Sequence, residues 1–275
     1  MTFVYKPCIP IAKLAFGAIL LLLPACSAPK QKIAPVQAKI NGEIHNVYQT
    51  RIESIRRDPL AYLHEVLENC RKLQQYSVNF TRQERRGIGF FKSLHEPELI
   101  ACKFRRNPFS VYMKWLDPDV KYGESTFVSG LENDKVRFIP RNGLFGLSPT
   151  LHKVELQTPV IWGEARHPMT EFGLERMMEH TLEALRESGD EYSMTYEGLT
   201  KLNEYDAPVH AFKFTLPSRL FAAPMREVYV DAATDLPACT RILYTNGKLE
   251  AAYIWADVNP DVNFTDDDFI LDAER

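Results

Sequence analysis

The sequence lacks the residue patterns that mark common catalytic and metal sites. Its 275 residues contain no Gly-x-Ser-x-Gly motif, no His-Glu-x-x-His motif, no phosphate-binding glycine loop and no Cys-x-x-Cys pair. His167 and Glu171 stand close in sequence, with His180 beyond. Pro168 places His167 outside the helix that follows, so these side chains need not share a face. We therefore expect a protein that is not an enzyme and needs neither a cofactor nor a metal ion.

An excess of positive charge is also missing. The chain carries 33 lysines and arginines against 36 aspartates and glutamates, which gives a net charge of −3. A nucleic-acid-binding domain is expected to be net basic, so we expect no nucleic-acid partner. Arginines and lysines do crowd among aromatic residues over 82–106. We interpret that cluster as the solvated outer face of a sheet, with a binding surface as the alternative.

Cysteine is scarce, with five residues in the whole chain. Cys8 and Cys26 belong to the N-terminal segment, which leaves Cys70, Cys102 and Cys239 for the rest. Three thiols allow at most one disulfide within the chain and leave one thiol over. The sequence leaves open whether any pair forms. Cys70 falls on an apolar helix face, where a cysteine acts as a small buried hydrophobe.

No apolar run is long enough to cross a bilayer, which takes about 20 residues. The longest, from Leu14 to Leu23, is short and follows Lys6 and Lys13, as in a secretory signal. It ends in Leu23-Pro24-Ala25-Cys26, which resembles a bacterial lipobox and implies lipidation of Cys26. The alternative is an ordinary cleaved signal in which this cysteine is incidental.

The expected organisation has three parts. Residues 1–25 form the signal peptide, 26–50 the lipidated N-terminus with a polar tether, and 51–275 one folded domain. The residue after the cysteine is Ser27 rather than aspartate. By the sorting rule of such lipoproteins, this favours an exported protein anchored at the outer membrane and facing the periplasm.

The folded part begins with a helical pattern and then changes to strands. Asp58-Pro59 predicts an N-cap and first turn, followed by an apolar stripe that extends the helix to about residue 75. Thr170 is expected to cap a second helix that ends near residue 188. Between and after these helices the apolar residues alternate with polar ones, which predicts strands at 76–80, 99–106, 109–115, 124–130, 135–139, 210–216 and 226–231.

Asn246-Gly247 predicts a two-residue hairpin turn in which Thr245 faces Lys248. Counting outward from that turn fixes which side chains share a face. One face is mixed, and the other is rich in aromatic residues. The residues expected on the aromatic face are Thr240, Ile242, Tyr244, Leu249, Ala251, Tyr253 and Trp255.

Two groups of motifs resemble a known superfamily over roughly residues 60–270. At the C-terminal end these are Val228-Tyr229-Val230-Asp231, Thr234-Asp235-Leu236-Pro237, the Asn246-Gly247 hairpin and the segment 264–269. They resemble the bacterial lipoprotein carriers and sensors that include LolA, LolB, RseB and LppX. The segments 103–115 and 166–170 resemble a bacterial domain of unknown function related to that superfamily.

The resemblance implies an α+β fold: one strongly curved antiparallel sheet, an unclosed β-barrel, with helices covering its concave face. In the carriers the space between sheet and helices holds acyl chains. The expected function is therefore that of a membrane-anchored periplasmic lipoprotein that binds or carries a lipid or acylated ligand. The alternative is a sensor or protein-interaction module of the cell envelope, in contact with another envelope protein and without transport activity.

Apolar residues on the predicted elements are the candidates for a ligand cavity, because each buried methylene of a ligand contributes about 0.8 kcal/mol. Plain core packing is the competing interpretation for each of them. The apolar segment 143–147 lies between glycines and is a candidate lid. The candidate cavity residues are Phe109, Val111, Met113, Trp115, Met177, Met178, Phe212, Phe214, Tyr253 and Trp255, and the candidate lid residues are Leu144, Phe145 and Leu147.

Overall fold

The computed structural model of the protein describes residues 42–141 and 149–272. All of them belong to one unit of the chain, residues 37–275. The predicted signal peptide 1–25, the lipidation site Cys26 and most of the tether lie outside the described residues. The candidate lid residues Leu144, Phe145 and Leu147 lie outside them too. These expectations stay predictions.

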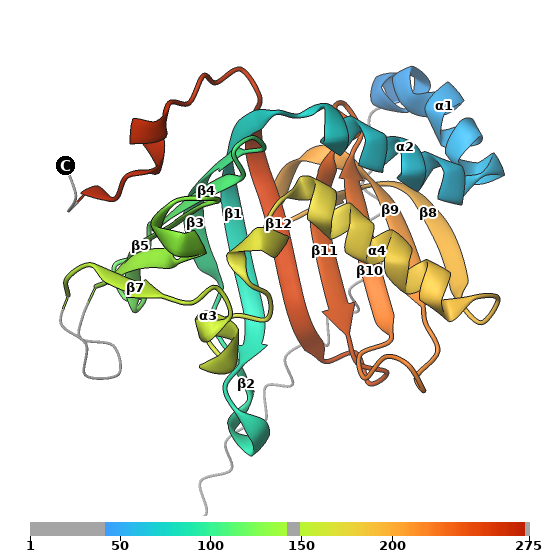
Figure 1. The fold of residues 1–275 in the computed structure, drawn as a ribbon. Helices are drawn as coiled ribbons and strands as arrows, with labels where there is room; N and C mark the ends of the chain where they lie inside the picture. The colour runs from blue at the N-terminus through green and yellow to red at the C-terminus, as the bar shows by residue number, and fades with distance from the viewer. Residues whose placement is uncertain (1–41, 142–148, 273–275) are drawn as a thin grey trace, which may run out of the picture. The chain divides into compact units, whose positions relative to one another are not determined.

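The described residues build one large antiparallel sheet (Figure 1). Its order is β7-β6-β5-β4-β3-β1-β12-β11-β10-β9-β8, and the short β2 pairs with β1 beside this path. The two ends of the path, β7 and β8, leave the sheet open. The strands are β1 (Gln75–Arg86), β2 (Ser93–Leu94), β3 (Glu98–Arg105), β4 (Ser110–Trp115), β5 (Tyr122–Val128), β6 (Val136–Pro140), β7 (His152–Val154), β8 (Ser193–Leu202), β9 (Tyr205–Thr215), β10 (Met225–Asp231), β11 (Pro237–Leu243) and β12 (Leu249–Asn259).

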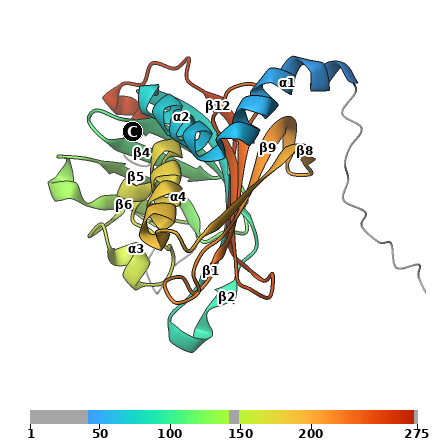
Figure 2. The same cartoon turned by 90° about the vertical axis from the view of Figure 1, so that its right-hand side faces the viewer.

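Helices cover the concave side of this sheet (Figures 1 and 2). They are α1 (Gly42–Arg57), α2 (Pro59–Lys72), the single turn α3 (Thr158–Ile161) and α4 (Leu174–Ser188). The α2 and α4 helices pack against each other and against the strands through one continuous core. The open, curved antiparallel sheet with helices on one face confirms the predicted fold class.

The central strand β1 shows why the sequence forms these elements. Tyr76, Val78 and Phe80 are buried, while the residues between them are only half buried. Because successive side chains of a strand point to opposite faces, all three point into the core. Facing strands β3 and β12 pair with β1 on either side and place their own apolar residues on the same face.

The β11–β12 hairpin keeps the predicted register along most of its length but not at its turn. Thr240 pairs with Tyr253, as expected. The N–H of Tyr244, however, donates to the carbonyl of Lys248 at 2.9 Å, so the turn holds three residues and Thr245 does not face Lys248. A register shift further along β11 absorbs the extra residue. Thr240, Ile242, Ala251 and Tyr253 of the predicted aromatic face therefore stay together, whereas Leu249 pairs with Leu243 of the predicted mixed face.

The α2 helix begins as predicted, but α4 begins later than predicted. A carboxylate oxygen of Asp58 accepts the N–H of Ala61 at 2.9 Å and caps α2. Thr170 caps nothing, because it lies in a 3₁₀ turn before α4. Instead, the Tyr76 hydroxyl caps the start of α4 by accepting the backbone N–H of Leu174 at 3.0 Å. Such a cap from a distant strand leaves no local sequence pattern.

The α1 helix lies across the predicted boundary between tether and domain. It begins at Gly42, within the stretch 26–50 predicted as tether. Its second half is part of the folded body, because Ile52 and Ile55 are each only 1% exposed. Arg51 also forms an ion pair with Asp235 at 2.9 Å. The three cysteines of the body, Cys70, Cys102 and Cys239, are buried and free.

A buried carboxylate joins three strands at the concave face. Glu98 of β3 accepts hydrogen bonds from Arg82 at 2.6 Å, from Arg86 at 2.5 Å and from the Trp115 indole at 3.1 Å. Burial alone would raise the pKa of Glu98, but the two guanidinium groups outweigh it and lower the pKa to about 2. Glu98 therefore stays ionised and forms ion pairs with two buried arginines.

We expect Glu98→Gln to lower the free energy of unfolding by about 3–5 kcal/mol, because loss of one partner leaves buried charges uncompensated. Urea unfolding at pH 7 measures this. Glu68→Gln is the matched control, since the Glu68 side chain is 60% exposed although it pairs with Arg71. The control should lose less than about 1 kcal/mol. Equal losses in the two variants would contradict the role assigned to Glu98.

A buried histidine makes stability depend on pH. His210 is fully buried, with its Nδ1 2.8 Å from the Tyr196 hydroxyl, and burial lowers its pKa from 6.5 to about 4. The unfolded chain takes up this proton near pH 6.5, whereas the folded chain resists it until about pH 4. The stabilising contribution is complete above pH 6.5 and is lost between pH 6.5 and 4, by roughly 3 kcal/mol.

We therefore expect His210→Phe to flatten the decline of unfolding free energy between pH 6.5 and 4. Denaturant unfolding across this range compares the slopes of the two proteins. Titration of Glu98 contributes mainly below pH 4.5, because the pKa of Glu98 is 4.5 in the unfolded chain and about 2 in the folded one, so the slopes are compared above pH 4.5. An unchanged slope in His210→Phe would show that another group takes up the proton.

Candidate functional site

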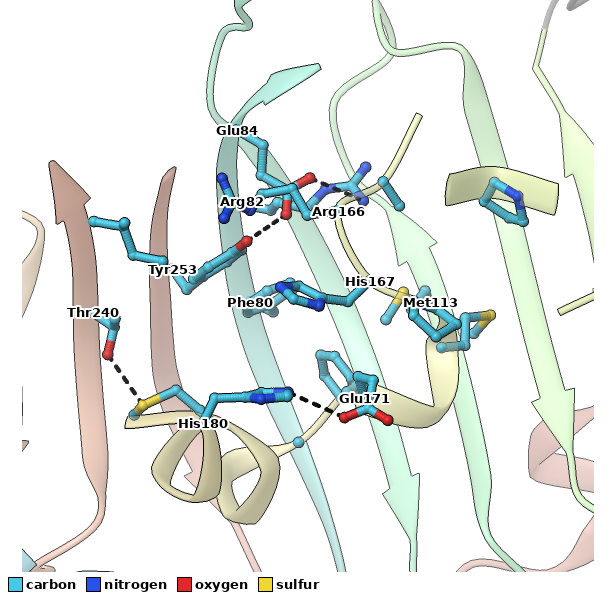
Figure 3. Close-up of a pocket in the computed structure, with 18 of the residues that line it drawn as sticks. Phe80, Arg82, Glu84, Met113, Arg166, His167, Glu171, His180, Thr240 and Tyr253 are labelled. Atoms are coloured by element: carbon cyan, nitrogen blue, oxygen red, sulfur yellow. Dashed lines mark hydrogen bonds and ion pairs between the residues drawn. The ribbon is translucent and has the colours of Figure 1, made fainter. Parts of the chain in front are cut away.

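A cavity of about 350 Å³ lies on the concave side of the sheet. Strands β1, β4, β5, β6, β10, β11 and β12 contribute to one wall, and α4 with the segment 159–173 contributes to the other. Figure 3 shows this arrangement, with His167 and His180 facing the strands that carry Phe80 and Tyr253. The volume falls at the lower end of the range of small-molecule sites, which is roughly 300–1,000 Å³.

Aromatic rings form the apolar part of the cavity. The Phe80 ring lies 5.2 Å from the Phe172 ring, edge to face, and 5.3 Å from the Trp255 ring. It also stacks on Tyr253 at 6.1 Å. Such contacts hold the rings in fixed positions, because each aromatic pair adds about 0.5–1.5 kcal/mol beyond simple burial. The wall is therefore preformed. Further apolar lining residues are Met113, Trp115, Tyr122, Val136, Phe138, Met177, Phe221 and Ile242.

Charged and polar side chains form another part of the lining. The carboxylate of Glu84 is buried and accepts the Tyr253 hydroxyl at 2.6 Å, while Arg82 lies 4.0 Å from its other oxygen (Figure 3). Burial, and then Glu84, raise the pKa of Tyr253 well above its usual value. Tyr253 is thus a neutral donor. Arg166 forms an ion pair with Glu250.

Two histidines and a glutamate meet at the roof of the cavity. His180 of α4 lies 3.1 Å from Glu171, and its ring stacks on that of His167 at 5.3 Å between centroids. The fold therefore brings together side chains that the sequence alone did not place on one face. Burial, then His180 and Arg166, lower the pKa of His167, so it is neutral at pH 7. Among the residues that the structure describes, no His, Cys, Asp or Glu cluster is arranged to hold a metal ion.

Five of the ten candidate cavity residues line this cavity, and five do not. Met178 and Phe212 are fully buried in the core, and Phe109 precedes β4 and packs against that core. Whether any of them contacts a ligand stays a prediction. The five that line the cavity are Met113, Trp115, Met177, Tyr253 and Trp255, and the five that pack elsewhere in the core are Phe109, Val111, Met178, Phe212 and Phe214.

The charged residues of the cavity lining were not predicted from the sequence. Arg82 and Glu84 alternate with Phe80 along β1, so all three point to the concave face. The alternation could have indicated a polar part of the site, because Arg82 and Glu84 continue the strand face that carries Phe80. Arg226 and Glu187 gave no such signal, because only the tertiary fold brings β10 and α4 to the same cavity.

No helix within residues 42–141 and 149–272 is long and apolar enough to span a membrane.

Solved structures similar to this chain are of low sequence identity. MucB is 16% identical over 80% of this chain and 64% of its own, with a TM-score of 0.45, so the chain spans less than two thirds of MucB. MucB has also been solved in complex with MucA. The lipoprotein LppX of Mycobacterium tuberculosis is 12% identical over 76% of this chain and all (100%) of its own, with a TM-score of 0.42.

A LolA superfamily protein of Nitrosomonas europaea is 9% identical over 76% of this chain and 98% of its own, with a TM-score of 0.30. No curated protein matches the sequence. Residues 73–274 match the family described as "Protein of unknown function (DUF1571)", and the chain belongs to that family.

Proposed function

We propose that this protein binds the apolar part of a lipid or acylated molecule in the cavity between its sheet and α4. The observation that carries the proposal is the cavity itself, an aromatic and methionine-lined space of about 350 Å³ at a place where the core would otherwise be closed. Most of the exposed lining is apolar, so covering it with the apolar part of a ligand removes that surface from water and favours binding.

The size and lining of the cavity limit the ligand. At the lower end of the range for small-molecule sites, the volume suits one apolar chain rather than several. Each methylene removed from water contributes about 0.8 kcal/mol, so a single chain binds without any specific polar contact. Met113 and Met177 suit varied chains, because a flexible thioether adapts its shape.

The proposed place of action is the cell envelope. The support is the N-terminal pattern that ends at Cys26. A single acyl chain anchors a protein weakly, whereas several hold it firmly, so a lipidated Cys26 would keep the domain at a membrane. In this proposal the tether lets the cavity work at that surface, on the periplasmic side of the outer membrane. Catalysis is not part of the proposal.

A second candidate function is a sensor or interaction module for another envelope protein. The turn Gly89–Phe91 between β1 and β2 favours it, because the Phe90 and Phe91 side chains are exposed. Ile161 of the neighbouring α3 is also exposed, and the Gly87 N–H donates to the carbonyl of Gly163 at 2.9 Å to hold the two segments together. Large apolar groups gathered on a surface mark contact sites.

The direct test is to purify the full chain from the membranes of the cells that make it and to extract it with organic solvent. Covalently attached chains at Cys26 remain with the protein, whereas a cavity ligand enters the extract. We expect one extractable lipid per protein, seen also as a mass shift in native mass spectrometry. Absence of any extractable lipid would leave the interaction module as the better candidate.

A cavity-filling substitution gives the second test. Thr240 is 4% exposed and lines the cavity, so Thr240→Phe should occupy space that a chain would take. We expect the affinity for a fluorescent fatty acid to fall about tenfold or more, because the phenylalanine excludes several methylenes of the fatty acid from the cavity. Thr195→Phe on the exposed side of β8 is the matched control and should bind normally. Equal affinity of both variants would place the fatty acid outside this cavity.

A further inference from the structure

One arginine of the cavity has no partner for its charge. Arg226 lies on β10, next to Ile242 of β11, and lines the cavity. Its Nε is buried without a hydrogen-bond acceptor. Among the described residues, no carboxylate oxygen lies within 4.0 Å of its guanidinium, although Arg82, Arg86 and Arg166 all have such partners.

The surroundings of Arg226 disfavour its charge. Burial, followed by repulsion from Arg166, lowers the pKa of Arg226 to about 10. Glu187 of α4 attracts it, but the Glu187 side chain is exposed and forms no ion pair with it. The guanidinium lies over the face of the Phe221 ring, at 5.6 Å from its centroid. A cation–π contact recovers about 1–2 kcal/mol, which only partly offsets the lost hydration of this half-buried guanidinium.

A second donor beside Arg226 is also unused. Arg166 pairs with Glu250 through one terminal nitrogen, while its Nε is buried without an acceptor. The Trp255 indole N–H of the same cavity lacks an acceptor as well. The unused polar atoms of the lining are thus mostly donors, and two of them belong to cations. Oxygen atoms of an anion would satisfy such a set.

We propose that Arg226, with the Nε of Arg166 beside it, binds the anionic head of an amphiphile whose apolar chain lies in the aromatic part of the cavity. This rests on the proposed function and names its ligand class: a long-chain carboxylate or a phosphate ester rather than a neutral lipid. A guanidinium offers parallel donors that match a carboxylate or phosphate, and a desolvated site strengthens the pair.

The test compares palmitate with its methyl ester as competitors of a fluorescent fatty acid bound to the full chain. Both carry the same apolar chain, but only palmitate carries a charge. We expect palmitate to bind roughly tenfold to a hundredfold more tightly, the range for hydrogen bonds to charged groups. In Arg226→Gln this preference should fall to a few-fold or less, while affinity for the methyl ester stays the same.

One variant gives a matched control, and a second tests the charge around Arg226. Arg219→Gln removes an exposed arginine of the nearby loop that pairs with Glu191, and it should keep the full preference for palmitate. Glu187→Gln removes the carboxylate that attracts Arg226 and should tighten palmitate binding. Without ligand, Arg226→Met should melt at the same or a higher temperature than the parent chain, because an apolar side chain replaces a half-buried cation whose Nε has no acceptor. A lower melting temperature would mean that Arg226 serves the fold.

The outcomes separate this inference from the proposed function. If neither palmitate nor its methyl ester binds, the proposed function fails and the headgroup site with it. If both bind equally, or if Arg226→Gln keeps the preference, the cavity binds chains but the headgroup site is wrong. Acetate and inorganic phosphate, the free anions, should not compete at millimolar concentration. Competition as strong as that of palmitate would show a site for free anions instead.

Discussion

The structure depends on one constraint: the concave face of an open sheet must be covered, and few elements are available to cover it. A closed barrel would bury this face by itself, but here β7 and β8 remain unpaired edges. The α2 and α4 helices close the face over part of the sheet and form the core there. Beyond α4 the cover is the irregular segment 159–173, and the cavity lies beneath it. The cavity therefore forms where the sheet extends beyond the area that α2 and α4 cover.

Two distant hydrogen-bonded groups hold this cover and the sheet in place. The Tyr76 hydroxyl on β1 caps the start of α4 and fixes the helix over the strands. The ionised Glu98 joins β1, β3 and β4 through Arg82, Arg86 and Trp115. Tyr76 lies on β1 and Glu98 on the neighbouring β3, so these central strands position both α4 and the strands that line the cavity. The aromatic residues of the lining, such as Phe80 and Trp255, belong to the same packed core.

The sequence predicted local elements better than their edges and their partners. The Asp58 cap, the end of α4 near residue 188 and the outer pairs of the β11–β12 hairpin are set by neighbouring residues, and each is found. Strand β8 was missed because it is an edge strand with only half-buried alternation. Within the site, Met177 lines the cavity and Met178 lies in the core, although they are neighbours on α4. No periodicity distinguishes them, since both belong to one apolar stripe.

The charged part of the lining is the strongest sign that the cavity is more than a packing defect. A defect would be lined by apolar residues, because each buried charge without a partner destabilises the fold. Here Glu84 and Arg82 lie beside the aromatic rings, and Arg226 lies against Phe221 with no anion in reach among the described residues. An unpaired cation next to an apolar space matches the proposed ligand, which has an apolar chain and a negative end.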